Sequence, residues 1–186
     1  EELGRLAEAE RRVRPAVERD PAFALSHKRL GNLLQSRGDL PGAVASYRRA
    51  VEHAPADAET RLWLGRALAA SGEGVAALEH LRVAAELEPG APQPLLAMAD
   101  MLAGYPDATV RQPAEAVRLA LRAVELTGRR DPVALLTLAN AHASAGDLPQ
   151  AVATGEEALA IAQQTGPGGL VQAIEARMAR WRQGGR

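Results

Sequence analysis

Two consecutive stretches of equal length decide the fold. Residues 24–57 read ALSHKRLGNLLQSRGDLPGAVASYRRAVEHAPAD, and residues 58–91 read AETRLWLGRALAASGEGVAALEHLRVAAELEPGA. When the two are aligned, Leu30-Gly31 falls on Leu64-Gly65, a step of 34 residues (65 − 31 = 34). Small residues, turn glycines and prolines recur with the same step, so the chain carries an internal repeat.

The spacing within each stretch predicts a pair of antiparallel helices. Gly31 and Ala43 are small, which allows the two helices of a hairpin to approach closely. Gly38 is expected to end the first helix in a conformation with positive φ, and Pro55 is expected to end the second. Because one hairpin cannot bury both of its faces, neighbouring hairpins must stack.

The composition favours an all-α class. Apolar residues make up 47% of the chain and aromatic residues only 3%. Ala and Leu suit close helix packing, whereas no stretch alternates apolar and polar residues as a half-buried strand does. The absence of cysteine excludes a disulfide framework and a thiolate metal site. No apolar run is long enough to cross a membrane.

The charge distribution argues against a nucleic-acid partner. The chain has 22 basic and 23 acidic residues, which leave a net charge of −1. The nearest approach to a basic stripe is at the C-terminal end, where four arginines lie: Arg177, Arg180, Arg182 and Arg186. A solvated, charged helix end explains this group better than a surface that follows phosphates. We therefore predict no nucleic-acid partner and no insertion of this segment into a membrane.

The repeated residues resemble the tetratricopeptide repeat family, in its bacterial form. Each of the two stretches matches the family pattern at a Leu-Gly pair, two small positions, one large position and a proline: Leu30, Gly31, Ala43, Tyr47, Ala50 and Pro55, then Leu64, Gly65, Ala77, Leu81, Ala84 and Pro89. The resemblance implies a right-handed α-solenoid of antiparallel helical hairpins with a concave groove. It also implies a non-catalytic binding module without a cofactor.

We predict a single domain, residues 1–186, built from four full repeats and two flanking elements. The divisions are a half repeat with only its second helix (1–23), repeats at 24–57, 58–91, 92–131 and 132–165, and a capping helix with a tail (166–186). The capping helix is expected from about Leu170 to Trp181, where apolar residues at helical spacing alternate with arginines. In the fourth repeat Gly155 replaces the usual large residue, so thinner packing is expected there.

The third repeat has a loop insert at residues 104–113. Its Tyr105-Pro106-Asp107 begins a string similar to a repeat variant found in large bacterial proteins. Tyr105 is expected to be an exposed aromatic residue on a loop of the kind that often carries function.

The N-terminal half repeat has two interpretations that stay open. Its small, large and turn residues fit a second helix: Gly4, Ala9, Val13, Ala16 and Pro21. The chain either begins inside a repeat of a longer protein, or starts with a natural N-terminal cap. The fit to the repeat pattern favours the first interpretation, because terminal caps tend to be atypical.

The resemblance places ligands in the groove lined by the first helix of each repeat. The candidate binding residues of this chain at those positions are Lys28, Asn32, Gln35, Trp63, Arg66, Gln93, Asp100 and Asn140. One position is polar in every full repeat and predicts a polar stripe of Asn32, Arg66, Asp100 and Asn140. An ordinary solvated helix face is the open alternative. Trp63 is either an aromatic anchor in the groove or a packing residue, and packing is favoured.

One known ligand of the family is not expected. Lys28 and Asn32 match the first two residues of the carboxylate clamp that holds the C-terminal acid of chaperones. Trp63 stands where that clamp needs an asparagine, and Gln93 and Ala97 stand where it needs cations. A carboxylate held without cations loses its charge-assisted hydrogen bonds.

The sequence leaves three functional hypotheses. The leading one is a protein-interaction scaffold that binds a peptide or helix of a partner, whose identity stays open, in the concave groove. The alternative is a non-catalytic segment of a larger bacterial enzyme, such as a glycosyltransferase-like or sulfatase-like protein, which positions substrate or promotes oligomerisation. The third is self-association through the exposed N-terminal half repeat. No catalytic residue, metal site or cofactor is predicted, and a soluble segment in either the cytoplasm or the periplasm is expected.

Overall fold

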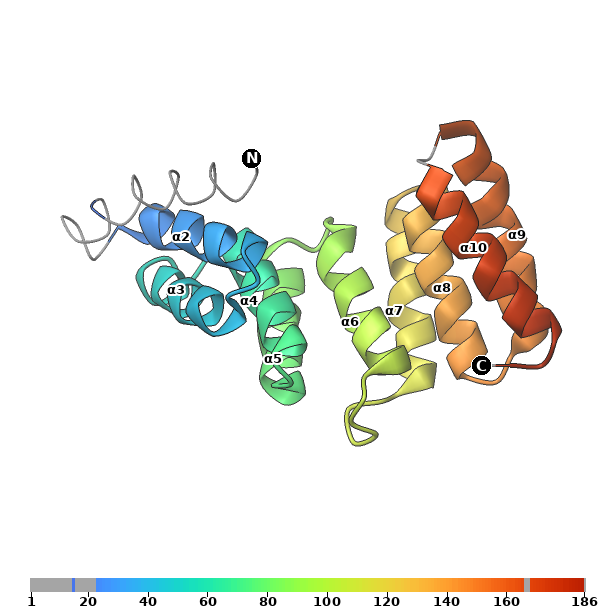
Figure 1. Ribbon diagram of the computed structural model, residues 1–186, viewed down its shortest axis with the longest axis horizontal. Coiled ribbons are helices and arrows are strands. Elements are labelled where there is room, and N and C mark those ends of the chain that lie inside the picture. Colours follow the sequence, from blue (N-terminus) through green and yellow to red (C-terminus); the bar gives the residue numbers. More distant parts are fainter. Residues whose placement is uncertain (1–14, 16–22, 166–167, 186) are drawn as a thin grey trace. The chain divides into compact units, whose positions relative to one another are not determined.

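The computed structural model describes residues 15, 23–165 and 168–185, which belong to two compact units that meet in the chain between Glu88 and Pro89. Every regular element of the described residues is a helix (Figure 1), so the predicted all-α class is confirmed. The predicted half repeat, with Gly4, Ala9, Val13, Ala16 and Pro21, lies outside the described residues, as does Arg186. The self-association hypothesis therefore stays a prediction.

The N-terminal unit is made of two helical hairpins. The first hairpin pairs α2 (Ala24–Ser36) with α3 (Leu40–His53), and the second pairs α4 (Ala58–Ala70) with α5 (Gly74–Leu87). Helix α3 also packs against α4, which joins the hairpins into one stack (Figure 1). Both second helices end before the prolines that were expected to stop them, Pro55 and Pro89.

The hairpins depend on a glycine that faces a large residue of the paired helix. A Cβ atom added at Gly31 would lie 2.6 Å from the ring of Tyr47, and one at Gly65 would lie 2.7 Å from Leu81 Cγ. Tyr47 and Leu81 are fully buried. The repeated Leu-Gly pair therefore leaves space for the large residue of the next helix, which allows the two backbones to approach.

The turns between paired helices have the predicted chemistry. Gly38 and Gly72 adopt φ angles of 79° and 88°, which are costly for residues with a Cβ atom. After the first turn, Asp39 accepts a hydrogen bond from Gly42 N at 3.0 Å and so caps α3. The glycine and the acid together set where the first helix ends and where the second begins.

The C-terminal unit contains two further hairpins and a final helix. Its elements are α6 (Pro92–Gly104), α7 (Pro113–Leu126), α8 (Pro132–Ser144), α9 (Leu148–Thr165) and α10 (Gly168–Arg182). Helix α6 pairs with α7 and α8 with α9, while α8 also contacts both helices of the preceding hairpin. Helix α10 packs along α9 (Figure 1), where its Ile174, Met178 and Trp181 are buried. The predicted repeat boundaries are compatible with these helices and stay a prediction.

The expectation of thin packing around Gly155 is wrong. A Cβ atom added at Gly155 would lie 2.9 Å from Met178 Cγ and 3.1 Å from the indole of Trp181. The space that a large residue fills in the first two repeats is filled here by side chains of the final helix. Gly155 is therefore the docking point of α10 on α9.

The expectation that Tyr105 is exposed is also wrong. In the connection between α6 and α7, Tyr105 and Val110 are buried, at 8% and 4% of their full exposure. Gln112 N donates a hydrogen bond to Leu102 O at 2.8 Å, which fixes the end of the connection against α6. The insert is a packed connection, because its two large apolar residues point into the unit.

Candidate functional site

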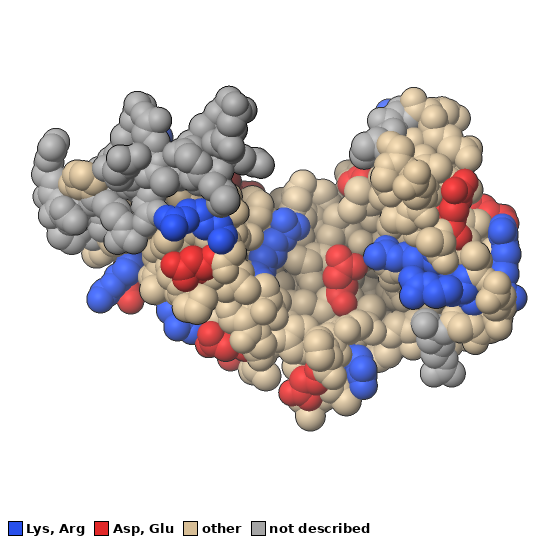
Figure 2. All heavy atoms as spheres, viewed as in Figure 1, with Lys and Arg blue, Asp and Glu red and all other residues tan. Residues whose placement is uncertain are grey.

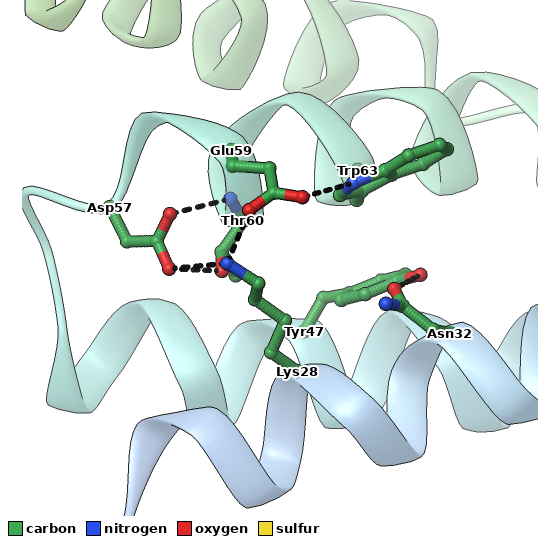
Figure 3. Close-up of polar contacts among 7 residues, drawn as sticks. All are labelled: Lys28, Asn32, Tyr47, Asp57, Glu59, Thr60 and Trp63. Atoms are coloured by element: carbon green, nitrogen blue, oxygen red, sulfur yellow. Dashed lines mark hydrogen bonds and ion pairs between the residues drawn. The ribbon is translucent and has the colours of Figure 1, made fainter.

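Lys28 forms ion pairs inside the N-terminal unit. Its ammonium group lies 3.1 Å from Asp57 Oδ2 and 2.6 Å from Glu59 Oε2, both at the start of α4 (Figure 3). Burial alone lowers the pKa of Lys28, but its contacts with Glu59 and Asp57 outweigh burial and raise that pKa above the ordinary value. Lys28 therefore joins α2 to α4 as a charged residue.

Asp57 is held by the same contacts and by its own helix. It accepts hydrogen bonds from Thr60 N at 3.0 Å and Thr60 Oγ1 at 2.7 Å, which caps α4. Burial alone raises the pKa of Asp57, but the bonds from Thr60 and Lys28 outweigh burial and lower it. The carboxylate therefore stays ionised and paired.

Asn32 and Gln35 lie on either side of a buried hydroxyl group. Tyr47 Oη lies 2.7 Å from Asn32 Oδ1 and 2.9 Å from Gln35 Oε1, and its one proton can be donated to either. Burial raises the pKa of Tyr47 to about 12, and the charge of Glu59 adds to the shift. The sequence identified Tyr47 only as the large packing residue, and its polar role was missed.

Trp63 and Arg66 contact each other along one side of α4. The guanidinium carbon of Arg66 lies 5.3 Å from the centroid of the Trp63 ring, a distance typical of a cation–π contact. Trp63 is half-buried, and its Nε1 donates a long hydrogen bond of 3.5 Å to Glu59 Oε1 (Figure 3). All five candidate residues of the N-terminal unit thus have a polar, ionic or ring partner within that unit.

The C-terminal unit brings two candidate residues, Asp100 and Asn140, into one hollow. A cavity of about 620 Å³ is lined by residues of α6, α8 and α10 and of the α6–α7 connection. Asp100 from α6 and Asn140 from α8 are among its walls, whereas Gln93 is exposed and is not. Ser144 Oγ donates a 2.6 Å hydrogen bond to Ala103 O, which ties α8 to α6 beside the cavity. The predicted stripe through all four repeats stays a prediction.

Three arginines complete the cavity, and sequence reasoning did not place them there. They are Arg111 from the α6–α7 connection and Arg177 and Arg180 from α10, next to the buried Trp181. The sequence grouped Arg177 and Arg180 with Arg182 as one charged helix end. In the structure Arg182 Nη2 lies 2.8 Å from Glu156 Oε1, so the group divides into a paired arginine and two that border the cavity.

Potential metal ligands do not gather among the described residues, which contain no cluster of three or more His, Asp or Glu side chains placed to hold a metal ion. His27 and His53 stack with their ring centroids 5.9 Å apart. No helix within the described part of the chain is long and apolar enough to cross a membrane.

The comparisons with known proteins agree with this architecture. Among solved structures, a chain of the APC/C hetero-tetramer Cut9–Hcn1 has a TM-score of 0.79 at 16% identity, over 97% of this chain and 33% of that one. YrrB has a TM-score of 0.72 at 17% identity, over 94% and 86% of the two chains. PilF of Pseudomonas aeruginosa has a TM-score of 0.74 at 20% identity, over 98% and 79%. This chain thus spans about a third of the first of these proteins.

No curated protein sequence matches the chain significantly. The family model described as tetratricopeptide repeat matches residues 1–52, 28–92 and 108–167, which is well over half of the chain. The chain belongs to the tetratricopeptide repeat family.

Proposed function

We propose that this chain is a non-catalytic scaffold that binds a peptide or a helix of a partner protein in the cavity formed by α6, α8 and α10. The observation that carries the proposal is the cavity itself, which has the volume of a typical ligand pocket. Its walls contain Asp100 and Asn140, which occupy equivalent positions on the first helices of successive repeats. The partner side chains would therefore lie along the face that the family resemblance assigns to ligands.

The two units differ in how their candidate residues are satisfied. In the N-terminal unit Lys28 is paired with Asp57 and Glu59, and the Tyr47 hydroxyl group can donate its hydrogen bond to Asn32 or to Gln35. A ligand there must compete with internal bonds, and breaking a partly buried ion pair is costly. The C-terminal cavity is favoured as the primary binding site because it is open and is lined by Arg111, Arg177 and Arg180, which form no ion pair with a described residue.

The comparisons supply general support. Tetratricopeptide repeat proteins are generally protein-interaction scaffolds and typically lack catalytic activity. YrrB is described as having an unusual peptide-binding site, and the Cut9–Hcn1 structure is a hetero-tetramer. The alternative that this chain is a segment of a larger enzyme stays a prediction, which the surrounding gene sequence tests.

Site-specific crosslinking tests the location of binding. A photo-reactive amino acid replaces Asn140 in the cavity, and a matched variant carries it at Gln150, an exposed residue of α9 outside the cavity. The crosslinked segment of the partner is identified by mass spectrometry and prepared as a synthetic peptide. We expect crosslinks from position 140 and weaker peptide binding after Asn140→Ala, which removes a neutral polar contact of the cavity and leaves its charge unchanged. Equal crosslinking from both positions, with peptide binding unchanged by Asn140→Ala, contradicts the proposed site.

A further inference from the structure

The arginines of the C-terminal unit divide into two groups. Of the eight described there, four form ion pairs with glutamates: Arg118 with Glu115, Arg122 with Glu125, Arg129 with Glu157 and Arg182 with Glu156. Of the other four, Arg111, Arg177 and Arg180 all line the cavity, and only Arg130 does not. Within the C-terminal unit, the guanidinium groups that form no ion pair with a described residue are thus concentrated at one hollow.

Two rigid elements hold these arginines in place. Arg177 and Arg180 are three residues apart on α10, so they lie on the same face of that helix. The helix is fixed to α9 by Met178 and Trp181, which pack on Gly155. Figure 2 shows a group of basic side chains over α10. The position of their backbone is therefore set before any ligand arrives.

Arg111 is presented by the packed connection between α6 and α7. Buried Val110 precedes it, and Gln112 after it is hydrogen-bonded to Leu102 O. Thr109 donates two hydrogen bonds to Asp107, and these, with a smaller effect of the Arg111 charge, lower the pKa of Asp107. The connection thus carries Arg111 to the cavity on a fixed backbone.

The net charge of the cavity favours an anionic ligand. Three guanidinium groups and one carboxylate, Asp100, line it, so its formal charge is +2. Like charges three residues apart on a helix repel each other. A ligand carboxylate relieves this repulsion and accepts charge-assisted hydrogen bonds in the planar geometry that arginine prefers.

We propose that the cavity recognises an acidic segment of a partner protein, whose Asp or Glu carboxylates bind Arg111, Arg177 and Arg180. This inference rests on the proposed function and adds the chemistry of the partner. A nucleic acid is disfavoured, because tracking its backbone needs a basic surface that extends over many phosphates. Here three of the four arginines of the C-terminal unit that form no ion pair with a described residue line one hollow, which also contains Asp100, on a chain of net charge −1.

Fluorescence anisotropy with defined probes tests the proposal. The complete chain is titrated against labelled hexaglutamate, a phosphoserine hexapeptide, a short single-stranded DNA and hexalysine, at low ionic strength. We expect hexaglutamate to bind and hexalysine not to bind. Arg177→Gln/Arg180→Gln is expected to weaken hexaglutamate binding by about tenfold, because the loss of each exposed charge pair weakens binding by up to about fivefold.

The matched control is Arg118→Gln/Arg122→Gln on α7, which removes the same charge from the same unit away from the cavity. It is expected to change affinity less than about twofold, through long-range electrostatics that salt screens. Circular dichroism checks that each variant is folded. If the α10 variant does not fold, Arg111→Gln on the connection supplies the same test.

Four results overturn the proposal. Equal losses in both double variants indicate general attraction to a basic surface, and no loss in the α10 variant places the binding elsewhere. Tighter binding of the phosphopeptide or DNA, lost in the α10 variant, assigns the cavity to phosphate. If hexaglutamate fails to bind while the crosslinked partner peptide still requires Asn140, the acidic-segment proposal fails and the scaffold proposal stands.

Discussion

Replacement of Lys28 by methionine should destabilise the N-terminal unit in a manner that depends on pH. The side chains of Lys28 and Asp57 are only 16% and 30% exposed. Exposed pairs contribute about 0.2–1 kcal/mol and breaking a fully buried pair costs about 3–5 kcal/mol, so this partly buried contact lies between these limits. The substitution also removes the ion pair with Glu59, which adds little because Glu59 is mostly exposed. We therefore expect Lys28→Met to lower the free energy of unfolding by about 2 kcal/mol in total.

A double-mutant cycle with Asp57→Asn isolates the ion pair from the helix cap. Asparagine caps helices about as well as aspartate, so this substitution removes the charge and keeps the bonds to Thr60. We expect a coupling energy between Lys28 and Asp57 of about 1 kcal/mol at neutral pH. The exposed pair of Arg49 and Glu52, at 65% and 55% side-chain exposure, is the control and should give about 0.5 kcal/mol or less.

The pH dependence follows from the two pKa shifts. The pKa of Asp57 is lowered by folding, so its contribution is present above the ordinary value of 3.8 and is lost as pH falls through the folded value. The pKa of Lys28 is raised, so its contribution is present below 10.5 and is lost as pH rises through its folded value. The coupling should therefore be largest between these limits and disappear in acid.

Urea denaturation of the complete chain measures the cycle. Trp63 lies in the N-terminal unit and Trp181 in the C-terminal unit, so all variants carry Trp181→Phe and the fluorescence reports Trp63 alone. The constant background cancels in the differences of unfolding free energy. A coupling that is no larger than that of the Arg49–Glu52 control, or that persists well below the ordinary pKa of aspartate, refutes the argument.

Three further substitutions test the packing and the turns. Gly155→Leu should destabilise the C-terminal unit by about 1–3 kcal/mol, because even the Cβ atom of the new side chain would lie 2.9 Å from Met178 Cγ. An unchanged melting temperature in thermal denaturation contradicts the assignment of Gly155 as the docking point of α10. Gly72→Ala should cost about 1 kcal/mol in urea denaturation through its φ of 88° alone, since no atom lies within 4 Å of the added Cβ; a neutral effect contradicts the strain argument. Tyr47→Phe should cost about 1 kcal/mol by removing a part-buried hydrogen bond. Because folding raises the pKa of Tyr47 from 10.0 to about 12, the stability of the native chain should fall as pH rises through this range, and spectrophotometric titration of tyrosinate monitors the ionisation.

The repeat period predicted most of the fold because it records packing constraints that each hairpin shares. Gly31 and Gly65 recur since the same close approach recurs, and Gly38 and Gly72 recur since the same turn recurs. Such features depend on contacts within about one repeat, so a sequence shows them directly. The packing at Gly155 could not be predicted in this way, because the side chains that contact Gly155 come from α10, a helix outside the repeat pattern.

The candidate site was predicted less well, because its chemistry depends on residues brought together by tertiary packing. Arg111 is separated from Arg177 and Arg180 in the sequence by the helices α7, α8 and α9, and nothing in their spacing joins them. Conversely, Lys28 and Asn32 occupy groove positions, but their partners within the unit were not visible in the pattern. The repeat positions predicted the helix face on which ligands bind. The ion pairs in the structure then showed which side chains are already engaged within the protein and which can bind a ligand.

The location of the arginines has a physical reason. The position that holds Lys28 in the first repeat is occupied by leucine in each later one, and Leu96 and Leu136 are buried. A position that packs between stacked hairpins cannot hold an unpaired charge without a large desolvation cost. The connection that carries Arg111 and the final helix α10 lie outside the repeated helix pairs, so their arginines are not required to pack between hairpins and can contact a ligand. The elements that break the repeat are therefore where specificity for one partner can develop without loss of the stack.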